Sequence, residues 1–248
     1  MKAAEALEIP DLRRMMQGLA EALGPKLRGA VLYGSAARGD FHEATSDLNL
    51  LLVLEDLDPA TLEALTPAVE RWRAKGHHAP RLFTTRLIAE SADVFPIEFL
   101  DIRAGRVVLH GDDPFAGLEI RGAYLRLQCE RELREKLMRL CEGYVECHGR
   151  RRDLEWLLTS SYASFVALFR GCLRLLGDDP PLRNAEVVTA FCDRTGLDPV
   201  PFREIERLRR GEKVEIDPKS IFSRYYEQLR KAIGAVDRFH PEGGGGTR

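Results

Sequence analysis

The sequence predicts an α+β protein in which a small mixed β-sheet with packed helices is followed by an all-helical bundle. Two observations carry this prediction. Short apolar runs alternate with helical segments as far as residue 117, and helical periodicity alone follows from there. The expected divisions are residues 1–117, residues 118–240 and a glycine-rich tail, 241–248, which is expected to be disordered.

Composition limits the class of protein. The chain has 248 residues, 44% hydrophobic and 31% charged, as in a globular protein. Its net charge of -2 gives no basic field, so nucleic acid is not an expected partner. No apolar stretch approaches the ~18 residues that span a bilayer. With no signal peptide and five scattered cysteines, a cytoplasmic protein without a membrane partner, disulfide framework or zinc site is expected.

The first part begins with a predicted helix over residues 11–23, which ends at Gly24 and Pro25. Apolar runs next to glycine and aspartate predict the strands. In chain order the remaining expected elements are strand 28–33, strand 47–54, helix 59–75 interrupted by Pro67, strand 81–84, helix 85–92, strand 95–102 and edge strand 106–110.

The second part shows only helical periodicity. Between residues 123 and 149 apolar side chains recur every three or four positions, which draws one stripe along a long helix. The other expected helices are 154–176, 185–195 with Asn184 as its cap, 201–210 and 218–239. The apolar helix 154–176 must be buried against something, which makes the helical half a candidate homodimer surface.

Residues 31–53 hold the first candidate site. An apolar run ends at Gly34 and Ser35, and the following residues are able to begin a helix. Glycine lets the backbone approach a ligand closely, and N–H groups at a helix start, with the Ser35 hydroxyl, donate to phosphate oxygens. The alternative is an ordinary turn between a strand and a helix.

The strand that follows places oxygen ligands on one face. Residues two apart in a strand share a face, so Asp47 and Asn49 point the same way at its start. Carboxylate and amide oxygens at this spacing hold a magnesium ion against phosphate oxygens. Asp47 and Asn49 are therefore predicted metal ligands.

A third carboxylate is expected on a neighbouring strand. In the predicted strand 95–102, Glu98 shares a face with Leu100 and Ile102. A carboxylate on such an apolar face is costly to bury without a partner. Glu98 is therefore preferred to Asp101 as the third site residue, completing a site for one or two ions.

The stretch GSAARGDFHEATSDLNLLLV resembles the Gly-Ser and Asp-x-Asp signature of the polymerase-beta type nucleotidyltransferase superfamily, and in particular small bacterial antibiotic adenylyltransferases. In those enzymes an α/β nucleotidyltransferase domain precedes a helical bundle. The resemblance in sequence covers residues 31–53, with a looser match at FPIEFLDI. The second half resembles that of the family only in being helical.

The resemblance implies an enzyme that uses Mg²⁺ to transfer a nucleoside monophosphate from a nucleoside triphosphate, ATP being the first candidate, to a hydroxyl acceptor. It assigns Gly34, Ser35 and Arg38 to the phosphates, although a loop-surface role explains Arg38 equally well. Asp47 would be a catalytic metal ligand, and Glu98 either a ligand or the catalytic base for the acceptor hydroxyl. His42, in the same loop, is a further candidate for substrate contact.

Asn49 departs from the family pattern, in which an aspartate bridges two metal ions at this position. Two ions ~3.5–4 Å apart stabilise the attacking and leaving oxygens of such a displacement. An asparagine offers a carbonyl oxygen without charge. A net loss of about 3 kcal/mol in the transition state slows a reaction on the order of a hundredfold. Asn49 therefore predicts weakened catalysis with nucleotide binding retained.

Three functions stay open at this point. The first is nucleotidyl transfer to an unidentified hydroxyl acceptor. The second is a catalytically degenerate module that binds or senses a nucleotide. The third is a protein that binds a partner chain through its helical half.

Overall fold

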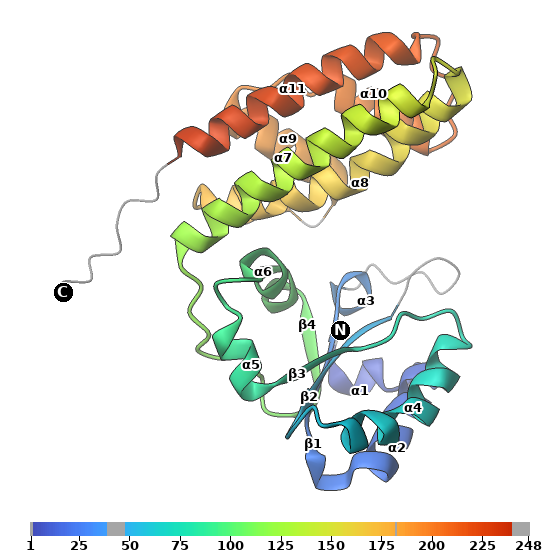
Figure 1. Ribbon diagram of the computed structural model, residues 1–248, viewed down its shortest axis with the longest axis vertical. Helices are drawn as coiled ribbons and strands as arrows, with labels where there is room; N and C mark the ends of the chain where they lie inside the picture. The colour runs from blue at the N-terminus through green and yellow to red at the C-terminus, as the bar shows by residue number, and fades with distance from the viewer. Residues whose placement is uncertain (1, 39–47, 182, 240–248) are drawn as a thin grey trace, which may run out of the picture. The chain divides into compact units, whose positions relative to one another are not determined.

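The computed structural model describes residues 2–38, 48–181 and 183–239 (Figure 1). Two compact units divide between Ile120 and Arg121. A sheet with helices forms the first unit, and helices alone form the second. The predicted α+β fold class is confirmed. The predicted tail, 241–248, lies outside the described residues.

The sheet of the first unit has four strands in the order β3-β2-β1-β4 (Figure 1). These are β1 (Leu27–Tyr33), β2 (Asn49–Leu54), β3 (Arg81–Thr84) and β4 (Arg106–Gly111). β1 runs antiparallel to β2 and β4, whereas β2 and β3 are parallel. The sheet is therefore mixed, and β4 is an edge strand, as the sequence predicted.

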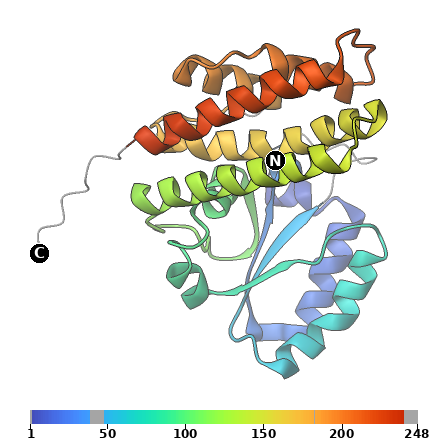
Figure 2. The ribbon, with the colours of Figure 1, turned by 45° about the horizontal axis from the view of Figure 1, so that its top comes forward.

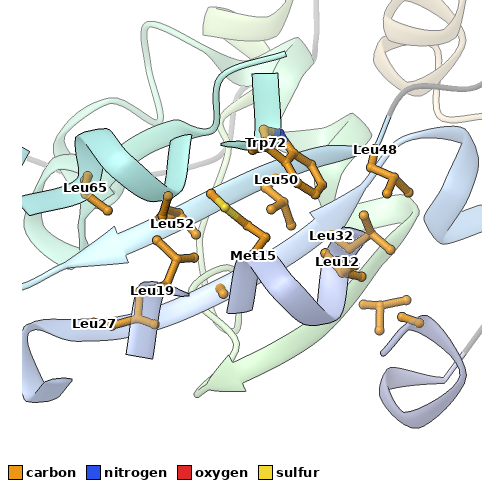
Figure 3. Close-up of a cluster of buried hydrophobic side chains, with 14 of the residues drawn as sticks. Leu12, Met15, Leu19, Leu27, Leu32, Leu48, Leu50, Leu52, Leu65 and Trp72 are labelled. Carbon is orange, nitrogen blue, oxygen red and sulfur yellow. The ribbon is translucent and has the colours of Figure 1, made fainter. Parts of the chain in front are cut away.

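One face of the sheet, the α2–α4 face, is covered by α2 (Pro10–Leu23) and α4 (Pro59–Arg73), which lie side by side (Figure 2). Short α1 (Ala3–Ala6) and a 3-10 turn at Gly24–Lys26 accompany them. The core here is built from α2 and α4 side chains against β1 and β2 (Figure 3), among them Leu12, Met15, Leu19, Leu50, Leu52, Leu65 and Trp72. α4 runs on through Pro67 instead of breaking there, because residues on both sides of the proline are buried in this core.

The opposite face, the α6 face, carries α5 (Thr85–Glu90) and α6 (Pro96–Ala104). Phe99 and Ile102 of α6 pack with Leu51, Val53 and Phe83 of the sheet. The prediction of a strand over residues 95–102 is wrong. A short apolar segment fits the period of a strand as well as that of a helix. Pro96 at the first helical position favours the helix, as do Phe99 and Ile102, which lie about one turn apart.

The second unit consists, over its described residues, of five helices: α7 (Gly122–Glu146), α8 (Arg151–Leu175), α9 (Asn184–Thr195), α10 (Val200–Arg209) and α11 (Pro218–Arg238). α8 contacts all four others, which explains its apolar character. Asn184 is the first residue of α9 rather than its cap, and its side chain accepts a hydrogen bond from Arg170.

No helix among residues 2–38, 48–181 and 183–239 combines the length and apolar character that crossing a bilayer requires.

Candidate functional site

Gly34 forms the junction between β1 and α3 (Ser35–Arg38). Its φ of 85° lies in the left-handed region that glycine adopts without strain. The strand, glycine and helix therefore follow one another as the sequence predicted. The side chains of Ser35 and Arg38 lie outside the described part of the structure, so their assignment to phosphate stays a prediction.

Asn49 lies beside the same junction. It is the first residue of β2 and pairs with Tyr33 at the end of β1. A Cβ atom built on Gly34 would lie 3.2 Å from Asn49 Nδ2. Two predicted site residues, Gly34 and Asn49, thus meet in space. We call this place the Gly34 junction.

Asp47 and His42 belong to residues 39–47, which lie outside the described residues. The assignment of Asp47 as a metal ligand and the contact of His42 with substrate therefore stay predictions.

Glu98 lies in the first turn of α6 and not on a strand. Glu98 was preferred to Asp101 because a strand would place it on an apolar face. That argument does not apply to a helix, in which successive residues do not alternate between two faces. Both carboxylates are half-buried. α6 nevertheless packs on the face that carries Leu51 and, by alternation along β2, Asn49. Glu98 thus stays a predicted site residue on a different element.

Tyr33 and Arg81, which were not among the predicted site residues, lie on the same face. Arg81 begins β3 and stands next to Leu51 of β2. Tyr33 packs against the α6-face core. Burial raises the pKa of Tyr33, and the charge and hydrogen bond of Arg81 oppose that rise.

A signal for Arg81 existed in the sequence. Residues 81–84 were expected to form a strand, and alternation puts Arg81 and Phe83 on one face of it. What the sequence lacked was the pairing of β3 with β2, which brings that face next to Leu51.

A second arginine at this end of the sheet, Arg106, forms an ion pair with Asp113. Arg106 pairs with Tyr33 on the other side, from β4. Its Nε donates to Asp113 Oδ1 at 2.9 Å, and this interaction lowers the pKa of Asp113. Arg106 therefore holds β4 to the following turn.

Among the described residues, Asn49 is the predicted metal ligand at the Gly34 junction, and it offers a neutral amide. No three His, Cys, Asp or Glu side chains gather closely enough to hold a metal ion in the described ranges. These residues do not by themselves form the predicted magnesium site.

A cavity of about 910 Å³ lies at the opposite end of the sheet. Its lining includes Leu54, Thr84 and Gly111, the last residues of their strands, together with the Arg28–Glu55 ion pair of 2.8 Å. No described residue of the predicted site lines it.

The comparisons with known proteins bear on the fold. The sequence matches no protein-family model and no curated protein. Among solved structures it is similar to spectinomycin adenyltransferase AAD(9) from Enterococcus faecialis, crystallised with ATP and spectinomycin, with a TM-score of 0.57 and 13% identity. The match covers 92% of this chain and 98% of that one. The likeness at this identity is one of fold, and it extends over both units of the chain.

Proposed function

We propose that this chain binds a nucleoside triphosphate, ATP first among candidates, at the Gly34 junction and transfers its nucleoside monophosphate to a hydroxyl acceptor. The observation that carries the proposal is the similarity in fold, over 92% of the chain, to an enzyme crystallised with ATP and spectinomycin. The contact between Gly34 and Asn49 supports it, because both belong to the stretch that resembles the superfamily signature.

In the proposed reaction the acceptor oxygen attacks the α-phosphorus, the bond to the bridging oxygen breaks, and pyrophosphate leaves. The acceptor proton passes to a base, for which Glu98 on α6 is the candidate. Asp47 is the proposed ligand for magnesium. Because the described residues do not form a metal site, we assign no step to the ion.

A second candidate function is nucleotide binding without turnover. Asn49 favours it, since a neutral amide lies at the junction where the superfamily signature places a bridging carboxylate. Both candidate functions require binding of a nucleotide. They differ in whether the chain also stabilises the transition state for transfer of the nucleoside monophosphate.

The substitution Asn49→Asp separates the two candidates. If the chain is a weakened transferase, a carboxylate at this position raises the rate of pyrophosphate release from ATP on the order of a hundredfold. The assay uses magnesium and a panel of hydroxyl-bearing compounds that begins with spectinomycin. Asn184→Asp in α9 is the matched control and leaves the rate unchanged.

The outcomes are distinct. ATP binding without turnover in both the native protein and Asn49→Asp would establish the binding module and overturn the transferase. Absence of binding with ATP, GTP, CTP and UTP, measured by calorimetry, would overturn nucleotide binding altogether.

A further inference from the structure

A cavity of about 510 Å³ lies between α2 and α4. Its floor consists of buried residues, Met15 and Gly18 of α2 with Ala68 and Trp72 of α4, and Figure 3 shows Met15 and Trp72 within the core. Its rim consists of polar side chains that are exposed or half-buried, namely Asp11, Arg14, Gln17, Glu21, Arg71 and Lys75. An apolar floor with a few polar groups, in a cavity of this volume, is typical of a site for a small molecule.

The cavity exists because Gly18 and Ala68 are small. The two helices lie side by side, and a Cβ built on Gly18 would come within 3.4 Å of the Ala68 Cβ. A larger side chain at either position would fill the space above the floor. Glycine destabilises the interior of a helix relative to alanine, so α2 is less stable with this space left open.

Arg71 places a positive charge over the floor. A Cβ built on Gly18 would lie 3.1 Å from Arg71 Nη2, so the guanidinium lies over that glycine. The side chains of Arg71 and Lys75 form no ion pair or hydrogen bond with any residue that the structure describes. Both charges are therefore available to a ligand.

The two carboxylates of the rim do not balance these charges. Asp11 is paired with Arg14, and its Oδ2 lies 3.3 Å from His77 Nε2. Glu21 accepts a hydrogen bond of 3.0 Å from Gln17 of its own helix. The α4 side of the rim thus stays positive.

We propose that this cavity binds a small amphipathic carboxylate, whose apolar body lies on Met15 and Trp72 and whose carboxylate group accepts hydrogen bonds from the Arg71 guanidinium. The planar fork of a guanidinium matches the two oxygens of a carboxylate. An apolar floor beneath one guanidinium suits an apolar molecule with a single anionic group better than it suits a polyphosphate. The inference goes beyond the proposed function, because no described residue of the predicted nucleotide site lines this cavity.

Calorimetric titration of octanoate and of 4-phenylbutanoate into the full chain tests the inference, with octanamide and 4-phenylbutanamide as neutral controls of the same shape. Native protein binds each carboxylate about tenfold or more tightly than its amide. Arg71→Met removes this preference and keeps amide binding. Arg73→Met, two positions along α4 and outside the cavity lining, keeps the preference of the native protein.

Trp72 reports where the ligand binds. The chain has two tryptophans, and the other, Trp156 on α8, is 70% exposed. Trp156→Phe therefore leaves Trp72 as the one tryptophan without opening a core. Octanoate has no absorption or emission of its own in the range of tryptophan fluorescence, and it changes the emission of this variant when it lies on the cavity floor.

Gly18→Ala separates the position of the guanidinium from the stability of the protein. The added Cβ displaces Arg71 Nη2, the far end of a flexible side chain. Alanine also favours the helix, so the melting temperature rises. A loss of octanoate affinity together with a higher melting temperature is the expected result, and it is not explained by unfolding.

Several results would overturn the inference. It fails if native protein binds neither carboxylate, or binds carboxylate and amide equally. It fails also if folded Arg71→Met keeps the native preference, or if octanoate leaves the emission of Trp156→Phe unchanged. Nucleotide binding at the Gly34 junction is measured separately with ATP and is not decided by any of these results.

Discussion

At the residue scale, one of the two carboxylates that the signature implies is replaced at the Gly34 junction. Asn49 contributes a neutral amide directly against Gly34. A neutral amide attracts a divalent cation less strongly than a carboxylate does.

Gly34 is the residue on which this arrangement depends. Gly34→Ala places a Cβ at a φ of 85° and 3.2 Å from Asn49 Nδ2. The backbone strain lowers the free energy of unfolding by about 1–2 kcal/mol. Displacement of Asn49 additionally weakens ATP binding. Chemical denaturation and calorimetry measure the two effects.

Gly76→Ala is the matched control for this prediction. Gly76 has a φ of 91°, but a Cβ there meets nothing within 4 Å. The Gly76→Ala variant therefore has the same backbone strain, and its added Cβ makes no contact with the Gly34 junction. Equal ATP affinity in the two alanine variants would contradict a role for the contact between Gly34 and Asn49.

At the scale of elements, α6 matters because it carries Glu98 and covers the face of the sheet that bears Asn49. Phe99 anchors it, with its ring 5.6 Å from Phe83 and 5.5 Å from Phe115, measured between centroids. Glu98 is the adjacent residue, so the packing of Phe99 determines where that carboxylate is held.

Phe99→Ala is expected to lower the free energy of unfolding by about 3–5 kcal/mol, because it opens a cavity in a fully buried position. Phe95→Ala, one helical turn away at a side chain 37% exposed, is expected to lower it by about 1–2 kcal/mol. Urea denaturation of both variants checks the difference. Equal losses would show that α6 is not anchored through Phe99.

At the scale of the whole molecule, each unit has a core of its own. The first has one on each face of its sheet. In the second, α8 is surrounded by helices, and Phe165 and Phe169 are buried on it. All five cysteines belong to the second unit, so their reactivity reports on its packing.

One thiol per chain is expected to react rapidly with a thiol reagent in the native protein. Cys141 is half-buried, whereas Cys129, Cys147, Cys172 and Cys192 are buried. Burial also raises the pKa of Cys147 and, to about 12, that of Cys192, which keeps the reactive thiolate scarce. Labelling followed by mass spectrometry counts the modified sites.

Cys141→Ser removes the rapid labelling if this account is correct. Rapid modification of two or more thiols in the native protein would contradict the packing of the second unit. Denaturant exposes the remaining four thiols, which provides the total for comparison.

The sequence by itself determined the α+β class, most helices and strands, and the strand–glycine–helix order at Gly34. These features depend on local signals: apolar periodicity, glycine that adopts a positive φ, and proline at helix starts. Such signals act over a few residues and are visible in any one stretch of chain.

The tertiary structure alone decided that residues 96–104 are a helix and that Arg81 lies on the same face of the sheet as Tyr33. A nine-residue apolar segment satisfies the period of either element, so its packing against Phe83 and Phe115 settles the choice. Arg81 is separated from Tyr33 by nearly fifty residues of chain, as their numbers show. Only the pairing of β3 with β2, and of β2 with β1, brings the strands of these two residues into one sheet.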